Sequence, residues 1–117
     1  MKIAIVGSRK LSVSNEEISR NLSGITITAI ISGGAKGVDQ CAARFAREMG
    51  IPLIEIKPDY KRFGRKAPLI RNGEIAQAAD LCLAFGETGG TSHAVSQFKK
   101  AGKKVIQISN PKQRELW

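Results

Sequence analysis

The sequence predicts an α/β protein built on a doubly wound parallel sheet, with about five strands and four helices in three layers. Short runs rich in Ile, Val, Leu and Ala alternate with segments of helical periodicity, and the connections between them are only a few residues long. That alternation is typical of a parallel sheet with helices on both faces. The 117 residues, 42% of them hydrophobic, suffice for one core. We therefore expect a single domain over residues 1–110 and a C-terminal tail over residues 111–117.

Five runs have the composition of strands, and they are residues 2–6, 25–31, 52–56, 80–85 and 104–108. The second run is β-branched and has no polar residue except threonine, as expected for an interior parallel strand buried on both faces. The third run begins with Pro52, whose missing N–H group is tolerated at the first residue of an edge strand.

Four segments have helical signals, and they are residues 14–22, 38–49, 68–78 and 91–101. Ser14 and Glu17 form the pattern of a capping box at the start of the first helix. The second helix has one apolar face and is followed by Gly50, where a left-handed C-terminal cap belongs. Pro68 suits the first turn of the third helix, and Gly102 is placed to cap the fourth.

A right-handed doubly wound sheet of this size most simply has the strand order 3-2-1-4-5. Ligands of such sheets bind outside the carboxyl ends of the strands at the point where the order reverses, here between the first and fourth strands. Glycine-bearing loops follow the first, second and fourth strands, at residues 7–9, 32–39 and 86–91. All three loops are therefore expected at the same edge of the sheet.

The three loops predict one nucleotide or phosphate pocket. Glycine lets backbone N–H groups approach an anion, and a helix N-terminus offers unpaired donors with a partial positive charge. None of the loops matches the P-loop or the dinucleotide fingerprint, and each glycine could also be only a turn residue. The candidate ligand-binding residues are Gly7, Ser8, Arg9, Ser32, Gly33, Gly34, Gly37, Asp39, Arg71, Asn72, Gly89, Gly90 and Thr91.

Two of the polar candidates, and the single histidine, call for a separate interpretation. Arg71 lies in the first turn of a helix that faces the carboxyl ends of the strands, where its guanidinium can bind phosphate or carboxylate. Asp39 either accepts a hydrogen bond from a sugar hydroxyl, orders the glycine loop, or only interacts with the helix dipole. His93 is the single histidine, and a general base needs a partner that the sequence does not identify. No metal-binding cluster is apparent.

The chain is strongly basic, with a formal net charge of +9, which favours anionic partners. Residues 57–67 are expected to form a polar, basic loop in which Tyr60 and Phe63 interrupt the lysines and arginines. Such a mixture is typical of single-stranded nucleic-acid binders. The alternative is a solvated loop anchored by its aromatic residues.

No apolar run approaches the ~20 residues of a membrane span, and the run at residues 3–6 is too short for a signal peptide. We therefore expect a soluble, cytoplasmic protein without a membrane partner. The two cysteines, Cys41 and Cys82, lie in apolar patterns and are expected to be buried and reduced.

The segments at residues 32–39, 68–72, 79–85 and 90–91 together resemble the SLOG superfamily, and their order and spacing are similar to its small YspA-like branch. The resemblance extends from Gly7 to the last strand. It implies a Rossmann-like, nucleotide-binding domain and a homodimer. Relatives in the superfamily are the DNA-processing A family, which binds single-stranded DNA, and the Lonely Guy phosphoribohydrolases, which release a base from a nucleoside monophosphate.

The Lonely Guy enzymes carry an arginine before their fourth strand and a PGGxGTxxE loop, with a catalytic glutamate, after it. Arg71 falls at the arginine and Gly90-Thr91 at the Gly-Thr pair, but Ala94 stands at the glutamate position. We therefore expect a nucleotide-type ligand to be sensed or sequestered, with no cofactor required. Two alternatives stay open, which are hydrolysis of an N-glycosidic or phosphate bond in a small nucleotide and single-stranded nucleic-acid binding through residues 57–71.

Overall fold

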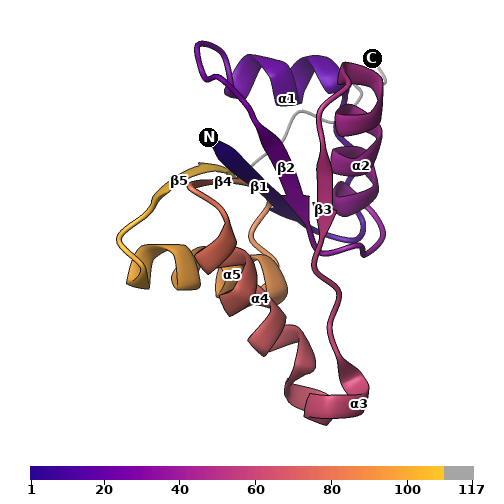
Figure 1. The fold of residues 1–117 in the computed structure, drawn as a ribbon, viewed down its shortest axis with the longest axis vertical. Coiled ribbons are helices and arrows are strands. Elements are labelled where there is room, and N and C mark those ends of the chain that lie inside the picture. Colours follow the sequence, from indigo (N-terminus) through magenta and orange to yellow (C-terminus); the bar gives the residue numbers. More distant parts are fainter. Residues whose placement is uncertain (110–117) are drawn as a thin grey trace.

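The computed structural model describes residues 1–109, which form a five-stranded parallel sheet with helices on both faces (Figure 1). The strands are β1 Lys2–Gly7, β2 Ala29–Ser32, β3 Leu53–Glu55, β4 Leu81–Phe85 and β5 Lys104–Ile108. They lie in the order β3-β2-β1-β4-β5, and every neighbouring pair is parallel. The predicted three-layer fold and strand order are confirmed. The predicted tail lies outside the described residues.

The longer helices are α1 Asn15–Asn21, α2 Val38–Met49, α4 Ala67–Ala78 and α5 Gly89–Lys100. Alternate residues of the central strand β1 show how these helices are divided between the two faces. Ile3 and Ile5 belong to an apolar cluster with residues of α1 and α2, whereas Ala4 and Val6 belong to a cluster with residues of α4 and α5. Because successive side chains of a strand point to opposite faces, each pair of helices covers one face of the sheet.

The local signals for helix ends act as predicted at two positions. Ser14 caps α1 by accepting the N–H of Glu17 at 3.0 Å, and Gly50 ends α2 in the left-handed conformation with φ of 68°. The end of α4 is stabilised by a contact distant in sequence. The ammonium of Lys103 donates to three carbonyl oxygens there, those of Ala76, Gln77 and Ala79.

The second strand is shorter than predicted, because residues 25–28 do not join the sheet. Ala29 lies opposite Lys2 in the register, so the preceding residues run past the beginning of β1. The N–H of Ile25 instead closes a turn onto the carbonyl of Leu22, 3.1 Å away. Ile25 and Ile27 still pack against the core, which explains their apolar character without a strand.

The basic segment after β3 is helical, so the prediction of an irregular loop at residues 57–67 is wrong. It contains the short helix α3 Tyr60–Phe63 and a 3-10 turn, η1 Gly64–Lys66, which leads into α4. Asp59 begins α3, since its Oδ1 accepts the N–H of Arg62 at 3.2 Å. Figure 1 shows α3 at the end of the molecule remote from α1.

Both cysteines are buried and free, as predicted. Burial raises the pKa of the Cys82 thiol to about 12, so this thiol is protonated at neutral pH. Within residues 1–109, none of the helices is at once long and apolar enough to cross a membrane.

Candidate functional site

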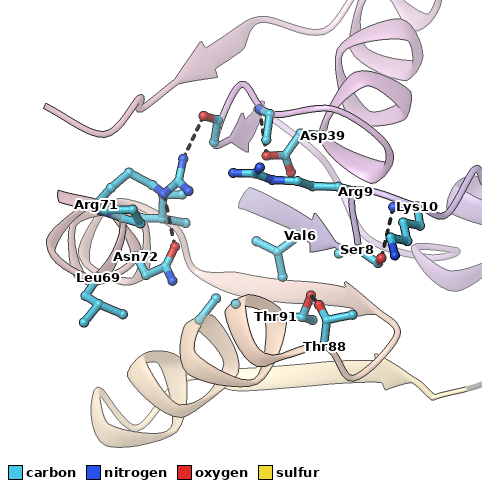
Figure 2. Close-up of a pocket in the computed structure, with 17 residues that line it drawn as sticks. Val6, Ser8, Arg9, Lys10, Asp39, Leu69, Arg71, Asn72, Thr88 and Thr91 are labelled. Atoms are coloured by element: carbon cyan, nitrogen blue, oxygen red, sulfur yellow. Dashed lines mark hydrogen bonds between the residues drawn. The ribbon is translucent and has the colours of Figure 1, made fainter. Parts of the chain in front are cut away.

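A pocket of about 480 Å3 lies at the carboxyl ends of β1, β2 and β4, where the strand order reverses (Figure 2). Its volume falls within the ~300–1,000 Å3 typical of small-molecule sites. Arg71 and Leu69 lie on one side of it, Ser8 and Thr91 lie on the other, and Arg9 extends beneath Asp39 (Figure 2). The lining residues are Val6, Gly7, Ser8, Arg9, Lys10, Gly33, Ala35, Asp39, Pro68, Leu69, Arg71, Asn72, Ile75, Thr88, Gly90, Thr91 and Ala94.

Most of the residues selected from the sequence meet in this pocket, namely Gly7, Ser8, Arg9, Gly33, Asp39, Arg71, Asn72, Gly90 and Thr91. Four others do not line it. Ser32 is fully buried, and its hydroxyl accepts the N–H of Gly34 at 3.3 Å, so it orders the loop after β2. Gly34 lies on the far side of that loop. Gly37 and Gly89 are close in sequence to lining residues but do not line the pocket themselves.

The glycines of the loop after β2 are required by contacts within the protein. A Cβ atom on Gly33 would overlap the guanidinium of Arg71, lying only 2.9 Å from its Cζ. Gly37 has a φ of 72°, and a Cβ atom there would overlap the backbone of Ser8 and Arg9. This close approach allows the N–H of Val38 to donate to the carbonyl of Ser8 at 3.1 Å. The glycines thus let the loops after β1 and β2 pack together.

The glycines at the start of α5 are in a different situation. The helix begins at Gly89, two residues earlier than predicted, so both Gly89 and Gly90 lie in its first turn. Within residues 1–109, and apart from the neighbouring residues of the same helix, no atom would lie within 4 Å of a Cβ atom at either position. Thr88, at the N-cap, provides no side-chain cap, because its hydroxyl bonds that of Thr91 at 2.9 Å. Gly90 and Thr91 line the pocket, so the first turn of α5, whose first N–H groups have no intrahelical partners, borders it.

Arg71 is held rigidly at the opposite wall. Its Nη1 donates to the carbonyl oxygens of Gly33 at 2.8 Å and Ile56 at 3.4 Å, and its Nε donates to Oδ1 of Asn72 at 3.1 Å. Nδ2 of Asn72 lies 3.1 Å from Nδ1 of His93, so this nitrogen of the histidine accepts the hydrogen bond. Nη2 of Arg71 makes no hydrogen bond within residues 1–109, which leaves this edge of the guanidinium for a ligand.

Asp39 is the only carboxylate among the described residues that line the pocket. Its Oδ2 accepts the N–H of Ala35 at 3.0 Å, so it does order the glycine loop. Burial raises the pKa of the Asp39 carboxyl, opposed by the Ala35 hydrogen bond and by the positive charges of Arg71 and Arg9. A hydroxyl donor in the pocket would stabilise the ionised carboxylate further.

The rim of the pocket is positively charged. Arg9 and Lys10 are both exposed, and within residues 1–109 neither side chain makes a hydrogen bond or an ion pair. Together with Arg71 they place three cations around one buried carboxyl group. This imbalance favours an anionic ligand.

Part of the pocket wall is apolar, and the sequence interpretation missed it. The apolar lining residues are Val6, Pro68, Leu69, Ile75 and Ala94. Leu69 is 50% exposed, so part of its side chain is accessible at the edge of the pocket. Leu69 is the third residue of α4, two residues before Arg71, and the sequence around it carries no pattern that marks it as part of a site.

The sheet order, the helices on both faces and the pocket at the reversal point define a protein of the Rossmann-like class. More particularly, the chain belongs to the YspA, cpYpsA-related SLOG family, whose model matches residues 1–63. The predicted SLOG resemblance is confirmed. The chain is also similar to the Gene 61 protein of Mycobacterium phage D29, with 35% identity over 103 residues, covering 81% of this chain and 80% of that protein.

Two solved structures share the fold. DNA processing protein A (DprA) from Streptococcus pneumoniae has a TM-score of 0.74 and 22% identity, and the match covers 97% of this chain. This chain spans about half of that protein, 51% of its length. The protein TM1055 has a TM-score of 0.69 and 21% identity, with 90% of this chain and 72% of that one covered. At these identities the two structures establish the fold alone.

Proposed function

We propose that this protein binds a nucleotide or a phosphoribosyl derivative in the pocket between β1 and β4, as a sensor or a sequestering protein. The observation that carries the proposal is that the uncapped start of α5 and Lys10 lie on one side of the pocket, and the apolar side chain of Leu69, beside Arg71, lies on the other (Figure 2). A nucleotide is divided in a similar way, with phosphate at one end and a base at the other. Family membership and the fold are compatible with such a ligand.

The phosphate is assigned to the space between the loop after β1 and the first turn of α5. Backbone N–H groups of Gly90 and Thr91 have no intrahelical partners there, and the helix dipole places partial positive charge at the same point. Arg9 and Lys10 complete the charge on the other side. The open surface around Gly90 lets a phosphate oxygen reach the backbone.

The sugar and the base then extend toward α4. The ribose lies over Val6, where a hydroxyl can donate to Asp39, and the base packs against Leu69 and Pro68. Nη2 of Arg71 faces the ligand between these two parts.

We propose binding, and not hydrolysis, as the main activity. Ala94 lines the pocket at the position where the Lonely Guy pattern carries its glutamate, and the carboxylate of Asp39, which also lines the pocket, accepts the N–H of Ala35. Incubation of the purified protein with nucleoside monophosphates and ADP-ribose should leave them intact. Release of a free base would instead establish the enzymatic alternative.

The test of binding is mass spectrometry of the small molecules that co-purify with the protein, followed by calorimetric titration of AMP and GMP. Arg71→Gln should weaken binding about tenfold or more, since it removes a charged hydrogen-bond donor. Arg65→Gln is the matched control, because Arg65 is an exposed arginine of η1 outside the pocket. Equal weakening by both substitutions would show that only net charge matters. The same samples, examined by light scattering, test the proposed homodimer.

A second candidate function is single-stranded nucleic-acid binding through residues 57–71. It is favoured by the exposed basic and aromatic side chains of α3, where the guanidinium of Arg62 lies 5.1 Å from the centre of the Phe63 ring and Tyr60 is 56% exposed. Affinity for an oligonucleotide should fall steeply with salt and with the charge reversals Arg62→Glu and Arg65→Glu. Binding that is absent or insensitive to salt would reject this candidate.

A further inference from the structure

A second pocket, of about 440 Å3, lies on the other side of the loop between β2 and α2. It shares Arg9, Ala35 and Asp39 with the first pocket, so the two cavities adjoin along these three residues. Gly34, which the sequence interpretation had selected and the first pocket does not use, lies in this second one. Its remaining lining residues are Lys36, Gln40, Ala43, Glu55 and Lys57.

The second pocket is lined mainly by charged side chains, in contrast to the partly apolar first pocket. Arg9, Lys36 and Lys57 contribute three positive charges, and within residues 1–109 none of their side chains makes a hydrogen bond or an ion pair. The aliphatic stem of Lys57 is placed against the loop, since its Cε lies 2.9 Å from the position that a Cβ atom on Gly34 would occupy. Glycine at this position thus leaves room for the lysine to reach the pocket.

The two carboxylates of this pocket do not neutralise it. Asp39 accepts the N–H of Ala35 and is buried, and Glu55, at the end of β3, has no cation within ion-pair distance among the described residues. Three cations against two carboxylates leave this pocket a net charge of +1, which favours an anion such as a phosphate group. The pocket therefore has the chemistry of an anion subsite.

Its position relative to Asp39 indicates which part of a ligand would enter it. In the arrangement proposed above, the ribose hydroxyls face Asp39, and this residue stands where the two pockets meet. A substituent on a ribose hydroxyl would pass Asp39 and enter the second pocket. Arg9 lines both cavities and is placed to contact an anion in either.

We infer that the ligand is a nucleotide with a second phosphate on its ribose, and that this phosphate occupies the pocket lined by Arg9, Lys36 and Lys57. The inference rests on the proposed nucleotide binding in the first pocket. The second phosphate is either a terminal monoester, as in a nucleoside 3′,5′-bisphosphate, or a diester that continues to a further nucleotide.

The experiment is calorimetric titration of the full chain with AMP, adenosine 3′,5′-bisphosphate and the dinucleotide pApA, together with the corresponding guanine compounds. At least one bisphosphate or dinucleotide should bind about tenfold more tightly than its monophosphate, as expected for a new charge-assisted contact. Preference between the bisphosphate and the dinucleotide distinguishes a monoester from a diester.

Lys57→Gln should reduce the affinity for the preferred compound about tenfold, to that of the monophosphate, and leave monophosphate binding unchanged. Lys61→Gln is the matched control, because Lys61 is an exposed lysine of α3 outside both pockets. Equal affinities for the mono- and bisphosphates, or equal effects of the two substitutions, would overturn the inference and leave the first pocket's function intact. If no compound binds, the proposed function fails and the inference fails with it.

Discussion

The loop after β2 and the first turn of α5 both contain adjacent glycines, yet the glycines serve opposite purposes. In the loop, a Cβ atom on Gly33 or Gly37 would overlap atoms of Arg71 or of the loop after β1. In the helix turn, Gly89 and Gly90 border open space within the described part of the chain. Glycine in the first region is therefore explained by the packing of the protein, whereas no packing contact explains glycine in the second, where we propose that a ligand binds. Similar sequence patterns thus give different kinds of evidence for a site.

Gly37→Ala should have the largest effect on stability. The substitution forces an alanine into a φ of 72° and places its Cβ against the backbone of Ser8 and Arg9. Strain and overpacking together should lower the free energy of unfolding by about 3 kcal/mol. Urea denaturation followed by circular dichroism measures this change. A loss below about 1 kcal/mol would show that the two loops are not held together as described.

Gly33→Ala should have an intermediate effect, because the flexible side chain of Arg71 can move where a backbone cannot. We expect a loss of about 1–2 kcal/mol in the free energy of unfolding as Arg71 gives up its hydrogen bond to the Gly33 carbonyl. A double-mutant cycle with Arg71→Ala isolates this contact. The Gly33 substitution should be less destabilising in the Arg71→Ala background, and additive effects would contradict the proposed clash.

Gly90→Ala should change stability little and binding strongly. Alanine favours the helix by up to about 1 kcal/mol, so the free energy of unfolding should stay the same or rise slightly. The new methyl group would project into the space assigned to phosphate, so calorimetric titration with AMP and GMP should show weaker binding. Gly89→Ala is the control, since Gly89 is equally open but does not line the pocket. If Gly90→Ala binds nucleotide as tightly as the unmodified protein, Gly90 does not provide access for a ligand, and the proposed difference between the two glycine regions is wrong.

Asp39→Asn should have the smallest effect, and the effect should depend on pH. Because burial raises the pKa of the Asp39 carboxyl above its ordinary 3.8, the folded state retains a proton that the unfolded state releases. We therefore compare the free energy of unfolding of the unmodified protein with that of Asp39→Asn. The difference, unmodified minus variant, should fall as the pH rises from about 3.8 through the raised pKa. Urea denaturation across this range measures the difference. A difference that rises with pH would mean that the nearby cations lower the pKa of Asp39 by more than its burial raises it.

Several parts of the fold could be predicted because their signals are local. The strand β1, the helix α2 with Gly50 at its end, and the cap of α1 by Ser14 depend on periodicity and on residues within one turn. The strand order followed from general rules of parallel sheets. The early part of the second predicted strand was wrong, because pairing depends on where the neighbouring strand lies.

The candidate site was predicted unevenly for the same reason. Arg71 was selected from its place at the start of a helix, but its fixation by Gly33, Ile56 and Asn72 joins residues far apart in sequence. Leu69 was missed, since an exposed leucine in a helix has no distinguishing local pattern. The helix α3 was missed because Asp59 is a single cap within a basic run.

The alternation of strands and helices could be predicted from the amino-acid sequence, and so could the placement of three glycine-bearing loops at one edge of the sheet. These properties follow from residue periodicity, capping and the geometry of parallel crossovers, which short stretches of chain encode. The folded arrangement was needed to distinguish Gly89 and Gly90, which border open space, from the glycines that closely approach Arg71 or Ser8. That distinction depends on atoms contributed by distant segments, and its position in space is fixed only when the sheet has assembled.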